Sequence, residues 1–442
     1  MKSRGELGIV KDLTRHVALL LAFPLMSMGQ TAPGDLVVDF RNAIDRARQY
    51  ANVLQSAGLA ARIATEDRVQ AKSTLLPSVN LFNQFIYTQA NGSDTGVFVA
   101  SNGPRVYTSQ VNVHEDLSLA RHYEYQRTIA AEAAAKARIE IASRGLVAAV
   151  VQSYYGVIAA EHKLKNAQGG VTDAEHFLDI TQKQEHGGEV AHADVVKAQL
   201  QLDQRKRDAQ DAQLAIEKAK IGLAVLIFPD FTQTFRVTDD LEPPTGPAVP
   251  AQAEVEASAK AKSPELNVAK LNLKQEEADV NAARTAYFPA FSFDYFYGLN
   301  ANQLAYRNQF GQLNLGNSAV VTMTVPVWSW GGLQSKVRQA RLRQQQAQLD
   351  LNLTERQLAA NVYGYYLEAQ VAARQIESLR RSVDLAAESV KLTLLRYQAG
   401  ESTALEVVDA ETTLLQARNG LDDGLARFRI ALGALQTLTG TL

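Results

Sequence analysis

The chain has 442 residues, a formal net charge of −2 and no cysteine. This length favours one large or two smaller units, and the near-neutral charge excludes the broad basic field of a nucleic-acid-binding protein. The lack of cysteine excludes disulfide frameworks, thiolate metal sites and cysteine nucleophiles.

The N-terminus has the composition of a secretory signal peptide. Four lysines and arginines precede a short apolar run, Val17 to Leu25, and small residues follow at Ser27 and Gly29. A charged region, an apolar core of roughly ten residues and a small-residue site are typical of a cleaved signal, which we assign to residues 1–29. No later apolar run reaches the ~20 residues of a membrane helix, so the mature chain is predicted to be soluble or to cross a membrane as β-strands.

Three pairs of segments show that the chain contains an internal repeat. They match at a constant separation of 211 or 212 residues: Ala71–Pro77 with Ala283–Pro289, Ala148–Tyr155 with Ala359–Tyr366, and Gly188–Val196 with Gly400–Val408. Several matches in one register indicate two copies of one structural unit. We assign the copies to residues 30–235 and 263–442, joined by a linker or equatorial segment, 236–262, whose prolines and glycine cannot continue a helix.

Each copy contains two short segments of alternating apolar residues, about 77–90 and 106–117 in the first and about 289–300 and 318–328 in the second. Aromatic residues on one face and small polar residues on the other are typical of membrane barrel strands. The loops between the strands are predicted at Asn91–Gly96 and Asn300–Asn317. Four strands cannot close a barrel, so in a membrane several chains would share one. The alternative is an ordinary hairpin on a soluble domain.

Each copy also contains a very long helical stretch that ends at a glycine-containing tip, near 187–190 and near 399–403. No proline occurs from about Leu117 to His186 or from about Leu333 to Ala399, and such a helix would be roughly 100 Å long. After each tip an apolar heptad predicts a coiled-coil seam with close backbone approach. Its larger residues are Val195, Leu202, Ala209, Ile216 and Leu223, and Val407, Leu414, Leu421, Phe428 and Leu435.

In this order, the segments resemble the TolC-type outer membrane efflux protein family. The resemblance is carried by Ala71–Pro77 and Ala283–Pro289, by Val325–Gly332 (VPVWSWGG), and by the tip Arg396–Ala410 (RYQAGESTALEVVDA). It implies a mainly α fold with β-barrel strands: a trimer with a 12-stranded outer-membrane barrel, four strands per chain, continued by a long periplasmic α-helical coiled-coil barrel. One departure is the first copy's strand-to-helix exit, Glu115–Arg121, which has neither proline nor a glycine pair.

The function implied by the resemblance is an outer-membrane exit duct of a tripartite efflux or type I secretion system, which extends into the periplasm. The implied partners are two further copies, a periplasmic adaptor (membrane fusion) protein, an inner-membrane pump and outer-membrane lipid, with no nucleic acid, cofactor or metal. The alternative, a periplasmic coiled-coil adaptor, would lack the two pairs of aromatic strands. An enzyme is not expected, because no catalytic motif is found and the long heptads contradict a compact α/β pattern.

The residues after the second tip resemble the family's periplasmic gate. Glu406 and Asp409 share a helix face, and in a threefold assembly each becomes a carboxylate ring that attracts cations. Tyr397 resembles the family tyrosine that hydrogen-bonds an acid of the neighbouring hairpin, and Asp194 occupies the position of that acid. Ser402 stands where some members carry an arginine. The alternatives are a solvated helix face for the carboxylates and simple packing for Tyr397.

The remaining candidates lie at the hairpin tips and beside the last strand. Glycines at the tips are predicted to permit left-handed backbone, and the resemblance makes the tips adaptor-docking sites. The tip residues are Gly187, Gly188, Gly400 and Glu401. Trp328 and Trp330 are predicted to anchor the chain at the membrane interface. The three histidines near the first tip have no metal-binding motif, and we expect solvated positions for them: His176, His186 and His192.

Overall fold

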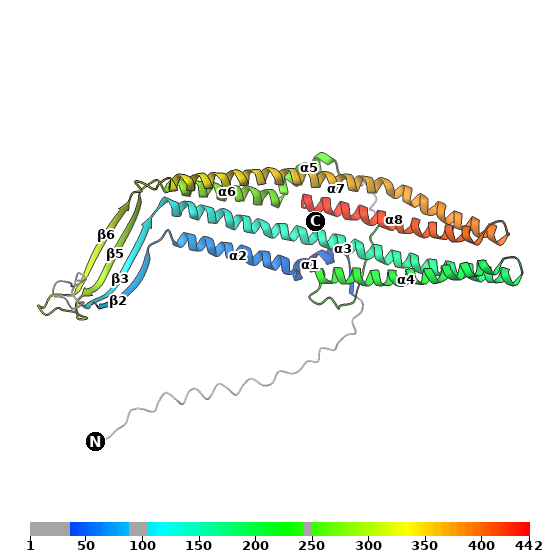
Figure 1. The fold of residues 1–442 in the computed structure, drawn as a ribbon, viewed down its shortest axis with the longest axis horizontal. Coiled ribbons are helices and arrows are strands. Elements are labelled where there is room, and N and C mark those ends of the chain that lie inside the picture. Colours follow the sequence, from blue (N-terminus) through cyan, green and yellow to red (C-terminus); the bar gives the residue numbers. More distant parts are fainter. Residues whose placement is uncertain (1–35, 88–104, 243–248) are drawn as a thin grey trace, which may run out of the picture.

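The computed structural model describes residues 36–87, 105–242 and 249–442. The chain is a long rod of helices with a small sheet at one end and two helical hairpin tips at the other (Figure 1). The predicted signal peptide and the loop Asn91–Gly96 lie outside the described residues. The Asn300–Asn317 loop is shorter than predicted, because strands continue into both of its ends.

Four antiparallel strands form the sheet, in the order β2-β3-β5-β6. They are β2 (Ser78–Tyr87), β3 (Arg105–Leu117), β5 (Ala290–Ala301) and β6 (Leu315–Thr324). Alternating apolar residues place one apolar face in register across the four strands, as in the row Val79, Val113, Tyr295 and Ala319. The last strand, predicted at 318–328, is shifted toward the N-terminus and ends at Thr324, two residues before Pro326, whose missing N–H cannot extend a ladder.

Two helices run the whole length of the rod, α3 (Leu119–His186) and α7 (Gly332–Gln398). Near the sheet they pack with α2 (Asn52–Ser73) and α6 (Pro264–Thr285), and toward the tips with α4 (His192–Ile227) and α8 (Ala404–Thr439). Figure 1 shows the two copies lying side by side, each with its own hairpin tip.

The heptad seam lies where the sequence predicts it. Leu202, Leu223, Val407, Leu414 and Leu435 are buried, and the other large members of both heptads are buried or half-buried. A stretch of α3 is long and apolar enough to cross a membrane by length and composition alone. Its valines and tyrosines supply much of the largest buried core, however, and a core helix meets the same criteria.

The segment between the copies is more structured than a simple linker. Its strand β4 (Phe235–Val237) pairs in parallel with β1 (Leu36–Val38), and it continues into α5 (Gln252–Lys262), which packs on α7 and α8. Helix α1 (Phe40–Tyr50) packs beside this pair on α3 and α4. These pieces form a belt around the middle of the rod and cover its largest core.

Candidate functional site

The outer strands of the sheet have no partner on one side within the described chain. β2 pairs only with β3, and β6 pairs only with β5. Nearly all residues of β2 and β6 are exposed, including the large apolar ones. An edge of this kind presents unpaired N–H and C=O groups, which have no water to bind in a bilayer core. The sheet is therefore incomplete in one chain.

The two sides of the helical layer carry matching apolar stripes. The layer toward the tips has the order α4-α3-α8-α7, so α4 and α7 are its outer members. The exposed apolar residues of α4 include Leu200, Leu214 and Ile221, separated by multiples of seven, and α7 shows the same spacing at Leu385 and Leu392. Seven-residue spacing is the signature of a coiled-coil contact, here without a partner in the chain.

The tryptophans predicted as membrane anchors lie in the connection from β6 to α7. Trp328 and Trp330 are 75% and 89% exposed, with ring centroids 5.7 Å apart. Trp330 has a positive φ of 52°, and Gly331, the N-cap of α7, has φ 80°. The backbone thus turns sharply here and leaves both indoles outside the helical packing, where interfacial side chains are expected. Their role as anchors remains a prediction.

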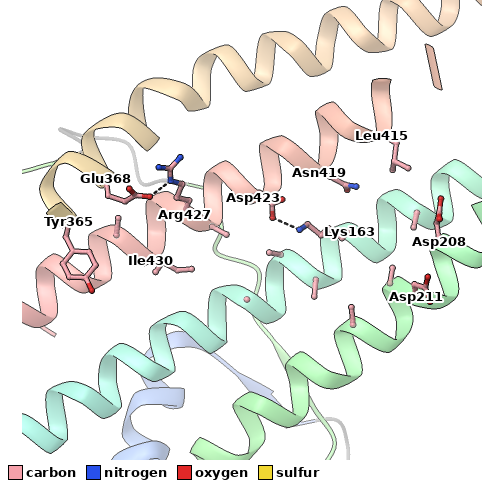
Figure 2. Close-up of a pocket in the computed structure, with 18 of the residues that line it drawn as sticks. Lys163, Asp208, Asp211, Tyr365, Glu368, Leu415, Asn419, Asp423, Arg427 and Ile430 are labelled. Carbon is pink, nitrogen blue, oxygen red and sulfur yellow. Dashed lines mark hydrogen bonds and ion pairs between the residues drawn. The ribbon is translucent and has the colours of Figure 1, made fainter. Parts of the chain in front are cut away.

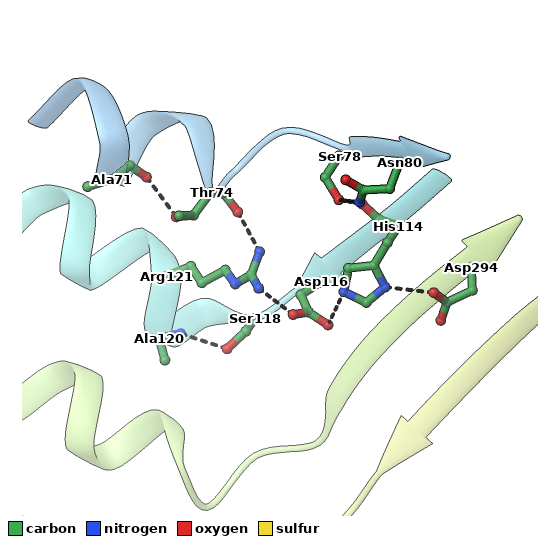
Figure 3. Close-up of polar contacts among 10 residues, drawn as sticks. All are labelled: Ala71, Thr74, Ser78, Asn80, His114, Asp116, Ser118, Ala120, Arg121 and Asp294. Atoms are coloured by element: carbon green, nitrogen blue, oxygen red, sulfur yellow. Dashed lines mark hydrogen bonds and ion pairs between the residues drawn. The ribbon is translucent and has the colours of Figure 1, made fainter. Parts of the chain in front are cut away.

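The first copy builds the same strand-to-helix exit from polar contacts (Figure 3). The ring of His114 lies between Asp294, at 2.7 Å from Nδ1, and Asp116, at 3.4 Å from Nε2. Arg121 pairs with Asp116 and donates to the carbonyl of Thr74 at 2.6 Å. These contacts tie β3 to β5 and α2 to α3, so the exit keeps its geometry without proline or a glycine pair.

The tip glycines differ in what they do. Gly188 and Gly400 have φ of 77° and 76°, the left-handed conformation that favours glycine. Gly187 has φ −76°, and a Cβ there would make only ordinary contacts, so the expectation of a left-handed backbone is wrong for Gly187. Glu401 follows Gly400 and donates its backbone N–H to the carbonyl of Arg396 at 2.8 Å. Docking of an adaptor at these tips stays a prediction.

Glu406 has a local structural role that the sequence analysis missed. Thr403 caps α8, and Glu406 reaches back to the Thr403 N–H at 3.4 Å, which completes a capping box. Ser402, in the position of the family arginine, donates to Glu406 at 3.2 Å. The hydrogen bond from the Thr403 backbone and that from Ser402 lower the pKa of Glu406. The pattern Thr-x-x-Glu after a tip was the signal for this cap.

The other two acids proposed for the gate are accessible to solvent in the single chain, and their role in a gate stays a prediction. Asp409 is exposed, one turn after Glu406. Asp194 is half-exposed in the first turn of α4, where a carboxylate favours the helix N-terminus. Both carboxylates remain available to a neighbouring chain.

Tyr397 is packed between the two hairpins. It is 2% exposed, its ring contacts Phe177 with centroids 5.2 Å apart, and its hydroxyl lies 3.4 Å from Thr181 Oγ1. Burial raises the pKa of Tyr397, the Thr181 contact opposes this, and the charge of Asp194 adds to it. Within one chain the hydroxyl therefore contacts Thr181 and not an acid; a lock to a neighbouring hairpin remains a prediction.

A buried charged cluster joins the two hairpins between α4 and α8. Arg205, at a heptad position, is 6% exposed and donates to Thr412 at 2.8 Å. Glu411 is half-buried, and its Oε2 has no hydrogen-bond partner among the described residues. Burial, then the charge of Asp173, raises the pKa of Glu411 to about 7, against the opposing charge of Arg205. Arg205 interrupts a seven-residue series of alanines, Ala198, Ala212 and Ala219, and this was the visible signal of the cluster.

The histidines near the first tip make ordinary contacts. His192 lies 2.7 Å from Glu185, and His186 lies 2.7 Å from the carbonyl of Gln182. No group of metal-ligating side chains suited to an ion occurs among the described residues.

Comparisons with known proteins agree with this architecture. Residues 43–227 and 257–441 each match the sequence model of the family described as outer membrane efflux protein. The chain is 21% identical over 434 residues to outer membrane protein TolC of Vibrio cholerae. The alignment covers 96% of this chain and 95% of the relative. It is 22% identical over 442 residues to the proteases secretion protein PrtF of Dickeya chrysanthemi, at 97% and 93% coverage. Among solved structures, the CmeC outer membrane channel of Campylobacter jejuni superposes with a TM-score of 0.81 at 17% identity, over 91% of this chain and 85% of that one.

Proposed function

The chain belongs to the outer membrane efflux protein family, and we propose that three copies of it close into one duct through which an export system releases its cargo. As a member, it is an exit duct in the outer membrane, with its helices in the periplasm. The sheet at one end of the rod supplies the part that spans the membrane, and the helices supply the periplasmic part.

The observation that carries the trimer is that both sides of the chain are incomplete in the same way. One side presents the edge of β2 and the apolar stripe of α4, and the other presents the edge of β6 and the stripe of α7. A head-to-tail contact between such sides generates a closed ring when its rotation closes, here after three copies. Three four-stranded sheets give a barrel of twelve strands, within the range of known outer-membrane barrels.

The gate proposal rests on the hairpin tips. In the ring, Glu406 and Asp409 form carboxylate rings at the periplasmic end, and Tyr397 with Asp194 holds adjacent hairpins together. The position of Tyr397 supports the second part, because this α7 residue is buried against the other hairpin, with its ring on Phe177 and its hydroxyl 3.4 Å from Thr181 Oγ1. The tips themselves, at Gly188 and Gly400, dock a periplasmic adaptor, which connects the duct to an inner-membrane pump.

The assembly is tested by placing a charge in the stripe. Leu214 is 53% exposed in the single chain, so Leu214→Asp costs little in the monomer but puts three charges into the three proposed contacts. The matched control is Gln213→Asp, an exposed position of α4 that lies about 100° around the helix from Leu214 and so outside the stripe. We expect native mass measurement in detergent to show a trimer for the wild type and for Gln213→Asp, and smaller species for Leu214→Asp. A trimer that forms equally well in all three proteins would refute the proposed contact.

A further inference from the structure

A run of basic residues without an acid opens helix α7, directly after the connection from β6 (Figure 1). The helix begins at Gly332, and its first acidic residue is Asp350, about five turns later. The basic side chains before Asp350 are all exposed, and Arg338 and Arg341 make no hydrogen bond or ion pair with the described residues. The run consists of Lys336, Arg338, Arg341 and Arg343.

Arg338 and Arg341 lie on the side of α7 that carries the belt. They are three residues apart and share a face, and Ala359, about five turns after Arg341, lines a cleft between α7 and α5. Arg343 stands the same number of turns before Asn361, which lines the hollow between the two hairpins on the other side of α7 (Figure 2). Belt elements inside a closed ring would obstruct its lumen, so the belt side is the outside. This inference therefore rests on the proposed function.

Both arginines lie within reach of the membrane surface. Their Cα atoms lie roughly 9 Å and 14 Å along the helix from Gly332, where the strand-to-helix connection ends. Helical side chains lean toward the N-terminus of their helix, which here is the membrane end, and a long arginine can extend its charge toward that surface. The headgroup layer below the hydrocarbon core is roughly 5–8 Å thick. The guanidinium groups therefore come to the level of the lipid phosphates, next to the exposed indoles of Trp328 and Trp330.

The neighbouring helix α6 leaves this positive charge in place. Its half-buried acids near the sheet face the other side: Asp279 lies 3.6 Å from Arg127 of α3, and the charge of Arg343 acts on both Glu276 and Asp279. In the second half of α6 the exposed charged side chains are two bases and one acid: Lys274, Arg284 and Glu277.

We propose that Arg338, Arg341 and the two tryptophans form a docking surface for anionic phospholipids of the periplasmic leaflet. The guanidinium groups pair with the lipid phosphate, which their planar fork can bind through two hydrogen bonds, and the indoles lie at the interface beside the same lipid. A zwitterionic lipid gains less, because its own ammonium group offsets the attraction of its phosphate. Three such surfaces, one per chain, surround the duct just below the membrane.

The probe is phosphatidylglycerol, with phosphatidylcholine as the zwitterionic reference. Trp328 and Trp330 are the only tryptophans of the chain, so its indole fluorescence reports on this surface alone. The trimer, verified by native mass measurement, is reconstituted at low salt in dibrominated phosphatidylcholine, whose bromine atoms quench nearby indoles. Unbrominated phosphatidylglycerol or phosphatidylcholine is then titrated in, and the recovery of fluorescence gives the preference for the anionic lipid.

Each arginine should contribute about five-fold to this preference, which is the effect of one basic residue at an anionic membrane surface. Arg338→Gln should therefore lower the preference about five-fold, and the double variant with Arg341→Gln about twenty-five-fold. Sodium chloride at about 1 M should lower the wild-type preference as well, because salt screens exposed charges.

Two matched variants each lose one exposed basic residue of α7 outside the surface. Lys336→Gln removes a charge at nearly the same depth but beyond the buried Val337, about 160° around the helix from Arg338. Arg356→Gln removes a charge on the same side as Arg338 but roughly 27 Å farther from the membrane. Both should keep the wild-type preference.

The soluble headgroup glycerophosphoglycerol separates lipid docking from binding of free phosphate. It should not compete at millimolar concentration, and competition would show a site for free phosphate in place of a lipid surface. A trimer whose indoles are quenched, but whose preference is equal in the wild type and the double variant, overturns the docking surface and leaves the duct intact. Indoles of the trimer that brominated lipid does not quench also overturn it, because they lie away from the membrane. A wild-type chain that forms no trimer removes the duct itself, and the surface with it.

Discussion

Neutralising the gate carboxylates without breaking the helix cap isolates their effect on ion passage. The double variant Glu406→Gln with Asp409→Asn removes six charges from a trimer. Glutamine also completes a capping box, so the hydrogen bond from the Thr403 backbone survives. Alanine at position 406 would instead remove the back-reaching side chain of the capping box, and loss of a cap costs about 0.5–2 kcal/mol.

The size of the expected effect follows from the charge of the ion. A lumenal potential of about one kT, modest beside the several kT that charged clefts reach, concentrates a monovalent cation roughly three-fold and a trivalent cation roughly twenty-fold. We therefore expect planar-bilayer recordings of the double variant to lose most of the preference for potassium over chloride. The concentration of hexamminecobalt(III) that blocks from the periplasmic side should rise about twenty-fold.

The pH dependence provides a second readout. Because the pKa of Glu406 is lowered, its carboxylate stays charged below the ordinary value for glutamate, and block of the wild-type channel should persist as the pH falls through 4.5, the ordinary pKa of glutamate. Thr403→Ala is the complementary variant, since it weakens the cap and keeps both charges. If the double variant retains both its selectivity and its trivalent block, the rings do not lie at the constriction, and Glu406 is only a capping residue.

Three further predictions concern stability. Leu414→Asp places an unpaired charge at a seam position that is 6% exposed, and should lower the free energy of unfolding by about 3–5 kcal/mol in a denaturant titration. Gly433→Ala puts a Cβ 2.6 Å from the buried side chain of Val151 and should cost about 1–3 kcal/mol in the same assay. His162 contacts Asp422 at 2.8 Å and Asp239 at 2.6 Å; burial opposes its protonation, but these two bonds outweigh burial and raise its pKa. The contribution of His162 to the stability of the fold should be complete below pH 6.5, the ordinary pKa of histidine, and be lost as the pH rises through the higher pKa of His162 in the folded chain. Thermal melts from about pH 5 to 9 would detect this loss.

Each of the three stability predictions has a control variant in the same chain. Gln416→Asp adds the same charge at an exposed position of α8 and should melt like the wild type. Gly420→Ala meets only Leu379 at 3.8 Å, an ordinary contact, so it should be neutral or slightly stabilising. His162→Gln should flatten the difference in melting temperature between pH 5 and pH 9. A wild-type protein whose stability does not fall across that interval would contradict the role of His162.

The repeat explains why so much of the fold could be predicted from one sequence. Matches at a constant separation assign the same role to paired segments, and the heptads then predict the seam that Leu202 and Leu414 occupy. What could not be predicted depends on contacts distant in sequence. The pairing of Leu36 with Phe235 joins two three-residue strands, which carry too few residues for a periodic signal.

The candidate site could be predicted only as far as its local patterns reach. Gly188 and Gly400 were recognisable because a hairpin turn needs left-handed backbone, whereas Gly187 lies beside such a residue without sharing its conformation. The cap at Glu406 had a visible motif that was read only as a charge. The state of Glu411 had no local signal, because burial between two hairpins raises its pKa and burial is a property of the packed chain.

The two copies show that one geometry can be reached by different chemistry. At the second strand-to-helix exit the turn comes from the backbone itself, through the left-handed Gly331. At the first exit the chain has no glycine there, and Arg121, Asp116 and His114 bind the same elements together. The constraint on both is shared: a strand in the sheet must continue into a helix of the layer, at an angle that keeps all four strands in one barrel. The shape of the assembly thus fixes the direction of each exit and leaves its residues free to differ, which is why the duplication remains visible in the fold where the sequence motif has been lost.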